Sequence, residues 1–283
     1  MHHIQAYIRL ARLDRPVGIF LCLWPTLWGL WFASPNPPWR YVLVFIAGVI
    51  LMRSAGCAFN DFADRHIDAK VWRTKRRPLV TGELKPKEAL LFGLALSLLA
   101  FIMVMAVLPW QAVLLALPAL GIALTYPYSK RFFPLPQAYL GIAFGFGIPM
   151  AFVAIQHAIP PLAWLLLFAN IFWAIAYDTA YAMVDKEDDA KLGIHSSTFL
   201  FGRYDIVAIL CCYAAFFFLL WYCGHLLALN HWYNLGILAA LLVSMRHYFL
   251  LRARQPALAF RVFLENQWTG GLIFLGLLLA RLI

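Results

Sequence analysis

Long apolar stretches, separated by short polar connections, follow one another along almost the whole chain. A helix of about 20 residues crosses the roughly 30 Å of hydrocarbon in a bilayer, and most of these stretches approach that length. Nine stretches can be drawn, at residues 17–34, 41–59, 88–108, 110–126, 137–156, 161–184, 206–229, 232–250 and 262–283. This pattern predicts an all-α polytopic membrane protein with nine transmembrane helices. Only Pro109 separates the third stretch from the fourth, which predicts a tight helical hairpin.

The composition excludes several classes of protein. Of the 283 residues, 64% are hydrophobic and 13% are charged, whereas soluble domains are about half apolar and a quarter charged. A soluble globular enzyme, a disordered chain and a disulfide-stapled secreted module are therefore excluded, and we expect one transmembrane domain over residues 1–283. The five cysteines lie inside apolar stretches without a C-x-x-C pair, so we expect them to pack as small hydrophobic residues.

The basic residues predict how the chain is oriented in the membrane. The net charge of +10 could suggest a nucleic-acid partner, but of the 23 Lys and Arg residues only Arg40, Arg53 and Arg281 fall outside alternate connections or their helix ends. Positive connections stay in the cytoplasm, so we expect no nucleic acid, a cytoplasmic N-terminus and an outer C-terminus. All thirteen acidic residues fall at or near the same cytoplasmic face, so we expect the chemistry to face the cytoplasm.

The second apolar stretch runs directly into a first acidic cluster. Asn60, Asp64 and Asp68 are spaced i, i+4 and i+8, which places them along one face of a helix, about 6 Å apart per step. Like charges at this spacing repel one another, so stability does not explain them. Mg²⁺ would relieve the repulsion, because it binds one or two carboxylates and completes its shell with substrate phosphate.

The sixth apolar stretch ends in a second acidic cluster. Asp178, Asp185 and Asp189 are spaced seven and four residues apart, again on one helix face. Isolated acids such as Glu187 and Asp188 are typical of solvated helix ends, but ionisable groups at membrane depth are costly and usually functional.

The two clusters also resemble each other. Residues 64–70 and 185–191 are identical at four of seven positions. This similarity favours an internal repeat of a four-helix unit, over about 1–130 and 131–250, in which the two acidic faces meet across a central cavity.

Basic residues accompany both clusters. Arg65 lies within the first cluster, and Tyr126, Lys130 and Arg131 close the fourth stretch with a phenol one helical turn from two cations. A further basic run comprises Arg73, Lys75, Arg76 and Arg77. These run residues either anchor to anionic lipid or bind substrate. A metal with Lys and Arg can hold a diphosphate and stabilise it as a leaving group, and aromatic faces can shelter an allylic cation. The pattern fits a polyprenyl diphosphate.

With these motifs the chain resembles the intramembrane aromatic prenyltransferase superfamily, and most closely its bacterial 4-hydroxybenzoate polyprenyltransferases. The motif Asn-Asp-x-x-Asp-x-x-x-Asp is matched by Asn60, Asp61, Asp64 and Asp68, the motif Asp-x-x-x-Asp by Asp185 and Asp189, and the element Tyr-x-x-x-Lys by Tyr126 and Lys130. The likeness covers nearly the whole chain.

The resemblance implies nine helices around a central cavity in the bacterial inner membrane, in contact with membrane lipid. It implies Mg²⁺-dependent transfer of a polyprenyl group from polyprenyl diphosphate to the ring carbon ortho to the hydroxyl of 4-hydroxybenzoate, with release of diphosphate, in ubiquinone synthesis. The expected metal ligands are Asn60, Asp61, Asp64, Asp68, Asp185 and Asp189. The residues expected to take part in catalysis are Asp64, Asp68, Asp185, Asp189, Arg65, Tyr126, Lys130 and Arg131.

Several alternatives stay open at this point. The carboxylate of the acceptor requires a cation, for which Arg131 is the first candidate and Arg40 the second; His66 and His195 also lie near the clusters. The acceptor could instead be haem, a dihydroxynaphthoate or a chlorophyllide. The protein could also be a cation-coupled transporter, which would likewise use acidic residues in the membrane. A purely structural role in the membrane would leave both acidic clusters unexplained. The prenyl chain length, the base that takes the ring proton and the oligomeric state do not follow from the sequence.

Overall fold

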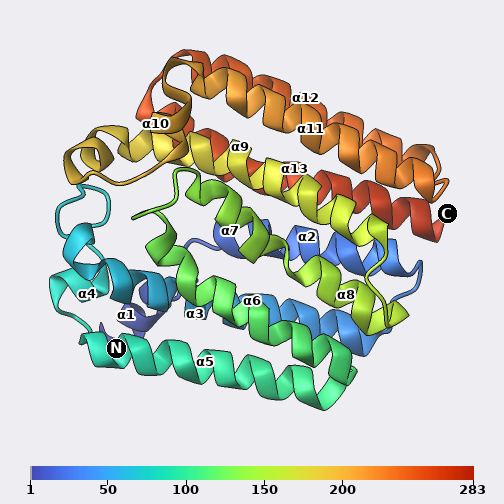
Figure 1. The fold of residues 1–283 in the computed structure, drawn as a ribbon, viewed down its shortest axis with the longest axis horizontal. Coiled ribbons are helices and arrows are strands. Elements are labelled where there is room, and N and C mark those ends of the chain that lie inside the picture. The colour runs from blue at the N-terminus through green and yellow to red at the C-terminus, as the bar shows by residue number, and fades with distance from the viewer. Residues whose placement is uncertain (1) are drawn as a thin grey trace.

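In the computed structural model, which describes residues 2–283, the chain forms a bundle of helices that run roughly along one long axis (Figure 1). The long helices are α2 (Val17–Ala33), α3 (Trp39–Asp68), α5 (Pro86–Val107), α6 (Trp110–Ser129), α9 (Pro161–Leu192), α11 (Asp205–Leu226), α12 (His231–Arg252) and α13 (Pro256–Leu282). The shorter ones are α1 (His2–Leu10), α4 (Pro78–Thr81), α7 (Pro136–Gly145), α8 (Gly147–Gln156), α10 (Ser197–Phe201) and the 3₁₀ helix η1 (Gly202–Tyr204). The predicted all-α class is confirmed.

Every predicted apolar stretch coincides with a helix. Within residues 2–283, eight helical segments are long and apolar enough to cross a membrane, counting α7 with α8 and α10 with α11 as single segments, and α2 is a shorter apolar helix of 17 residues. Large apolar side chains on the outer surface, such as Leu91, Leu98 and Trp110, are more than half exposed, as expected for side chains that face lipid. The chain is a multi-pass membrane protein.

Proline residues punctuate the helices. Pro86, Pro136, Pro161 and Pro256 each occupy the first turn of a helix, where the missing N–H is not needed. Pro109 precedes the first residue of α6 and separates it from α5, which confirms the predicted hairpin.

The tightest packing lies in the half of the bundle that contains α2, α9, α11 and α13. The ring centroid of Trp173 lies 5.3 Å from that of Trp28 and 5.5 Å from that of Phe216. The indole N–H of Trp173 donates to Asn266 Oδ1 at 2.9 Å, so the buried polar edge is satisfied. This half forms one side of the cavity described below, and α3, α5 and α6 line the other side.

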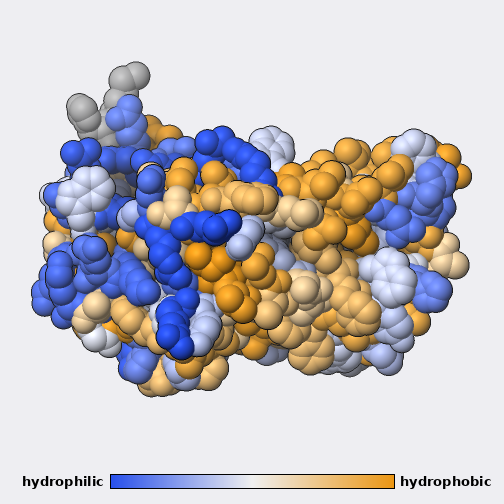
Figure 2. Space-filling model, turned by 90° about the horizontal axis from the view of Figure 1, so that it is seen from above, coloured by the Kyte–Doolittle hydropathy of each residue, from blue (hydrophilic) through white to orange (hydrophobic). Residues whose placement is uncertain are grey.

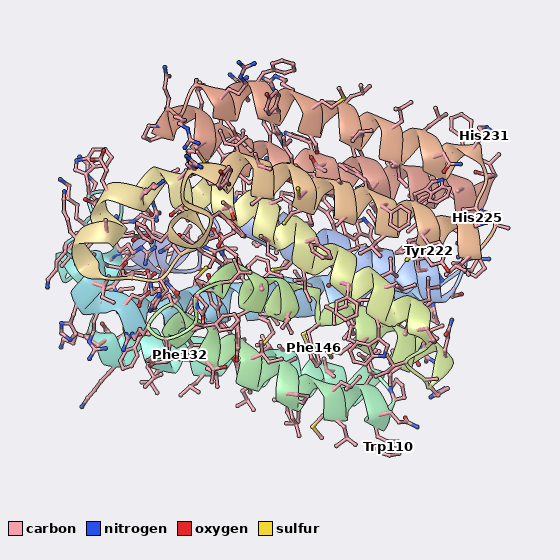
Figure 3. The ribbon with its side chains drawn as sticks, turned by 45° about the horizontal axis from the view of Figure 1, so that its top comes forward. Trp110, Phe132, Phe146, Tyr222, His225 and His231 are labelled. Carbon is pink, nitrogen blue, oxygen red and sulfur yellow. The ribbon has the colours of Figure 1, made fainter. Side chains whose placement is uncertain are left out.

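The two ends of the bundle differ in polarity. Figure 2 shows hydrophilic side chains gathered mainly at one end, with a broad apolar region beyond them. In Figure 3, Phe132 lies at this end, Phe146 lies midway, and Trp110 and His231 lie at the opposite end. We name the first end, where α3, α6 and α9 finish, the motif end (Figure 1).

Candidate active site

A cavity of about 830 Å³ runs into the bundle from the motif end. Its charged and polar lining comprises Arg9, Arg12, Asp14, Arg15, Arg53, Asn60, Asp61, Arg73, Arg76, Arg77 and Asp178. Farther in, the lining is apolar and includes Val44, Phe45, Val104, Leu108 and Met150. The cavity therefore joins a charged mouth to an apolar interior.

The first acidic cluster lies on the last turns of α3, as predicted, and is buried. Asp61, Asp64 and Asp68 are 1%, 1% and 5% exposed. Arg77 Nη1 lies 2.9 Å from Asp61 Oδ1 and donates to Asp68 Oδ2 at 2.6 Å, and Arg12 Nη2 donates to Asp61 Oδ1 at 2.8 Å. The burial is tolerable because each carboxylate has a cationic partner.

The last turn of α6 completes this cluster. Lys130 Nζ donates to Asp64 Oδ2, so the Tyr-x-x-x-Lys element and the first motif meet. Tyr126, one turn earlier on α6, lines the cavity. The other oxygen of Asp64, Oδ1, is buried and has no hydrogen-bond partner among the described residues, although Arg131 Nη2 lies 3.9 Å from it.

The second acidic cluster lies on the last turns of α9. Arg73 Nε donates to Asp185 Oδ1 at 3.0 Å, and Arg73 Nη2 donates to Asp185 Oδ2 at 2.5 Å, in a two-pronged pair. The same guanidinium lies 4.6 Å from the ring centroid of Tyr181. Asp178 lines the cavity, and neither its carboxylate nor that of Asp189 forms a hydrogen bond or ion pair with the described residues.

The loop after α3 connects the two clusters. Arg73 binds the α9 cluster and Arg77 binds the α3 cluster. Burial lowers the pKa of Arg73, but Tyr181 and Asp185 outweigh it and raise that pKa above its ordinary value. The pKa of Arg77 is likewise raised, by Asp61 and Asp68 against the effect of burial. Both cations are permanently charged and lie between the two acidic faces.

The donor atoms suit a hard divalent cation. No group of three or more His, Cys, Asp or Glu side chains within residues 2–283 is arranged to hold a metal ion, and Arg and Lys side chains contact the carboxylates of Asp61, Asp64, Asp68 and Asp185. Amide and carboxylate oxygens at Asn60, Asp61 and Asp64 are the ligand types that Mg²⁺ takes, and Asp64 Oδ1 is a buried acceptor in need of a partner. The residues present therefore fit Mg²⁺.

The large cavity includes only some of the predicted site residues. Asn60, Asp61 and Tyr126 line it. Arg65, Lys130 and Arg131 line a second cavity of about 700 Å³ together with His66.

The two arginines of the second cavity donate to main-chain carbonyls of α3. Arg131 Nη2 donates to the carbonyl of Ala63 at 3.0 Å, and Arg65 Nη1 donates to the carbonyl of Phe62 at 2.6 Å. Arg40 lies at the start of α3, far along the helix from the clusters. His195 meets the site only through its main-chain N–H, which donates to the carbonyl of Lys130 at 3.0 Å.

Arg53, which is not among the predicted site residues, lies in the middle of α3 and lines the large cavity. Its guanidinium carbon lies 5.4 Å from the ring centroid of Phe144, and its Nε is buried without a hydrogen-bond partner. No carboxylate of the described residues forms an ion pair with Arg53. The signal was available, since an arginine inside an apolar stretch is costly and usually functional.

Known proteins resemble this chain in sequence and in fold. The model of the UbiA prenyltransferase family matches residues 22–278. The 4-hydroxybenzoate octaprenyltransferase of Methylobacillus flagellatus is 56% identical over 97% of this chain and 93% of its own length. The enzyme of the same name from Nitrosomonas eutropha is 54% identical over 99% of this chain and 98% of its own length.

Solved structures share the fold. The apo structure of a UbiA homolog from Aeropyrum pernix superposes with a TM-score of 0.80 at 27% identity, covering 89% of this chain and 95% of that one. A UbiA homolog from Archaeoglobus fulgidus, bound to GPP and Mg²⁺, superposes with a TM-score of 0.72 at 19% identity, covering 95% and 99%.

Proposed function

We propose, from the premise that this chain belongs to the UbiA prenyltransferase family, that it is a 4-hydroxybenzoate polyprenyltransferase of ubiquinone synthesis. It transfers the polyprenyl group of polyprenyl diphosphate to the ring carbon ortho to the hydroxyl and releases diphosphate. The names of the full-length relatives give an octaprenyl donor. The observation that carries this proposal is that members of both acidic clusters, Asp61 and Asp178, line one cavity with an apolar interior, together with Arg73 and Arg77, which pair with the two clusters.

The diphosphate of the donor binds at the motif end through Mg²⁺. The proposed metal ligands are Asn60, Asp61, Asp64, Asp68, Asp185 and Asp189. When bound, Mg²⁺ neutralises the diphosphate and stabilises it as a leaving group. A homolog of the same fold, from A. fulgidus, is bound to GPP and Mg²⁺, which favours Mg²⁺ as the metal.

Side chains of this chain supply the remaining contacts to the diphosphate. Arg73, Arg77 and Lys130 are already concentrated around the two clusters, and they can turn from the carboxylates to phosphate oxygens once a metal takes their place. Tyr126 adds a phenol that lines the large cavity. Arg65 and Arg131 line the second cavity and add positive charge near the α3 cluster, where Arg131 Nη2 lies 3.9 Å from Asp64 Oδ1. Positive charge concentrated here stabilises the departing diphosphate.

The prenyl chain extends into the apolar interior of the cavity. Aromatic rings at Phe101, Phe144, Tyr177 and Tyr181 line the cavity, and ring faces stabilise the cationic character that develops at the allylic carbon. The apolar lining also excludes water, which would otherwise capture that carbon.

The carboxylate of 4-hydroxybenzoate binds Arg53 rather than Arg131 or Arg40. Arg53 is a cavity cation without a carboxylate partner among the described residues, and it lies eight residues before Asp61 on α3, about 12 Å along the helix axis. That distance leaves room for the acceptor ring between the carboxylate site and the diphosphate site. Asp178, a cavity carboxylate without an ion pair, accepts the proton that the ring releases.

The motif end faces the cytoplasm. The support is the concentration of Lys and Arg in connections at this end, since positively charged connections remain on the cytoplasmic side of the bacterial inner membrane.

The test is transfer by the purified protein in liposomes. We expect Mg²⁺-dependent prenylation of 4-hydroxybenzoate from octaprenyl diphosphate, and no product when EDTA is present. Haem, dihydroxynaphthoate and chlorophyllide serve as competing acceptors. Prenylation of one of these without any product from 4-hydroxybenzoate would refute the proposal.

A further inference from the structure

The guanidinium of Arg53 occupies a space beside α2 that exists because residue 18 of that helix is glycine. Gly18 on α2 faces it, and a Cβ atom at position 18 would lie 2.6 Å from Arg53 Nη2, 2.7 Å from Nε and 2.9 Å from Cζ. Carbon atoms do not approach so closely, so any side chain at position 18 would displace the guanidinium.

Two further contacts fix the guanidinium in this space. Arg53 Nη1 donates to the Sγ atom of Cys57, one turn farther along α3, where residues i and i+4 are neighbours. The ring of Phe144 on α7 lies beneath the guanidinium, 5.4 Å from its central carbon. Three helices therefore contribute to the position of this one cation.

The chemistry of these partners leaves the charge of Arg53 available. A thiol is a weak, neutral acceptor, and an aromatic ring attracts a cation without carrying a negative charge. A carboxylate at position 57 would hold Arg53 as firmly, but it would cancel the charge that a bound anion needs. Arg53 lines the cavity, and only its Nη1 forms a hydrogen bond with the described residues, so the guanidinium retains a donor for a ligand.

Without these contacts, the Arg53 side chain could turn toward acidic residues of the same cavity. Arg side chains are long and flexible and extend toward polar surroundings. Asp178, a carboxylate without an ion pair, and Asp61 line the same cavity. An unrestrained Arg53 would turn toward these acids and leave the acceptor site.

We propose that Gly18 and Cys57 are positioning residues that hold Arg53 in the orientation that binds the carboxylate of the acceptor. This inference rests on the proposed function, because it assumes that Arg53 binds that carboxylate. Gly18 supplies the space and Cys57 supplies a neutral acceptor, so the pair determines the preference for acceptors that carry a negative charge.

The experiment compares 4-hydroxybenzoate with its neutral isostere, 4-hydroxybenzamide, at saturating octaprenyl diphosphate. The isostere is measured as an acceptor or, where it is not prenylated, as a competitive inhibitor. We expect Cys57→Ala and Gly18→Ala to raise the KM for 4-hydroxybenzoate about tenfold, the size expected for one charge-assisted hydrogen bond. Apparent affinity for 4-hydroxybenzamide should change much less. Cys57→Ser, which keeps an acceptor atom, should restore most of the preference for the acid.

Two control variants match these changes. Gly48→Ala alters a second glycine that lines the cavity, on α3 rather than α2. A Cβ atom added at position 48 would have nothing within 4 Å. Cys223→Ala removes a buried thiol that does not line the cavity. Both should keep the preference for the acid.

Arg53→Gln separates failure of this inference from failure of the proposed function. If Arg53→Gln abolishes the preference for the acid while Cys57→Ala and Gly18→Ala keep it, the positioning role is overturned and the acceptor site stands. If Arg53→Gln itself keeps the preference, the proposed acceptor site fails. Equal losses toward both acceptors in Cys57→Ala would also overturn the positioning role, and if Gly18→Ala does not fold, the two Cys57 variants still decide.

Discussion

The two acidic clusters are similar in sequence but differ in their surroundings. On α3, Asp61, Asp64 and Asp68 are almost completely buried, and all three have cationic partners. Of the three acids in the α9 cluster, only Asp185 is paired, through Arg73, while Asp178 and Asp189 are partly exposed and form no ion pair with the described residues. Without ligand, the α3 carboxylates are thus paired with cations of the protein, whereas two of the three α9 carboxylates are not. Two clusters of similar sequence can therefore differ in how the protein neutralises them.

The largest effect should come from removing the carboxylates that both clusters are proposed to contribute to the metal. We expect Asp64→Ala and Asp185→Ala each to lower kcat/KM for transfer by about a hundredfold or more, since loss of a metal's supporting groups alone costs up to about that much. Asp68→Ala and Asp189→Ala should behave alike. The measurement is product formation per milligram of membrane-inserted protein, and near-normal turnover in any two of these four variants would refute the metal assignment.

The next largest effect concerns stability and separates the two clusters. Arg77→Ala leaves two buried carboxylates, Asp61 and Asp68, without their shared partner, although Arg12 still contacts Asp61. Breaking a buried pair costs about 3–5 kcal/mol, so the Tm should fall markedly. Arg73→Ala removes the cationic partner of Asp185. Because the Asp185 side chain is already 14% exposed, the Tm should fall less than in Arg77→Ala. The measurement is the Tm of each variant in the same detergent. An equal fall in Tm for Arg77→Ala and Arg73→Ala would mean that burial does not distinguish the two clusters.

Particular residues show which parts of the fold and of the site could be predicted from the sequence. Apolar stretches of about 20 residues must become helices in a bilayer, because only helices and closed barrels satisfy the backbone there; this is why the positions of α3, α9 and the Pro109 hairpin were correctly predicted. The partners of the carboxylates were not predictable, since Arg73 and Asp185 are 112 residues apart. The sequence alone does not determine how a helix is rotated, so the placement of Arg65 and Arg131 away from the large cavity was not foreseen.

A third prediction tests whether Asp189 of the α9 cluster, unlike Asp61 of the α3 cluster, contributes to ligand binding without contributing to the stability of the protein alone. Mg²⁺ with a non-hydrolysable diphosphate analogue of the donor binds only the folded protein and should raise its Tm. Asp189→Ala should abolish most of that rise while leaving the Tm without ligand nearly unchanged, because Asp189 has no ion pair to lose among the described residues. Asp61→Ala, by contrast, should lower the Tm without ligand, since it removes the carboxylate partner of Arg12 and one of the two carboxylates that Arg77 contacts. Identical behaviour of the two variants would contradict the distinction.

The smallest effect should come from Asp188, which lies beside the proposed metal ligand Asp189 but outside the motif spacing. Its carboxylate accepts from the main-chain N–H of Trp72 at 3.2 Å and lies 3.9 Å from Lys191 Nζ, with its side chain 30% exposed. Asp188→Asn keeps an oxygen that can accept from Trp72 and loses only a weak ion pair worth less than about 1 kcal/mol. We expect kcat/KM within about twofold of the unchanged enzyme and a Tm that is hardly altered. A loss comparable to that of Asp185→Ala would mean that total charge at this end, rather than the geometry of the motif, is what the metal and diphosphate require.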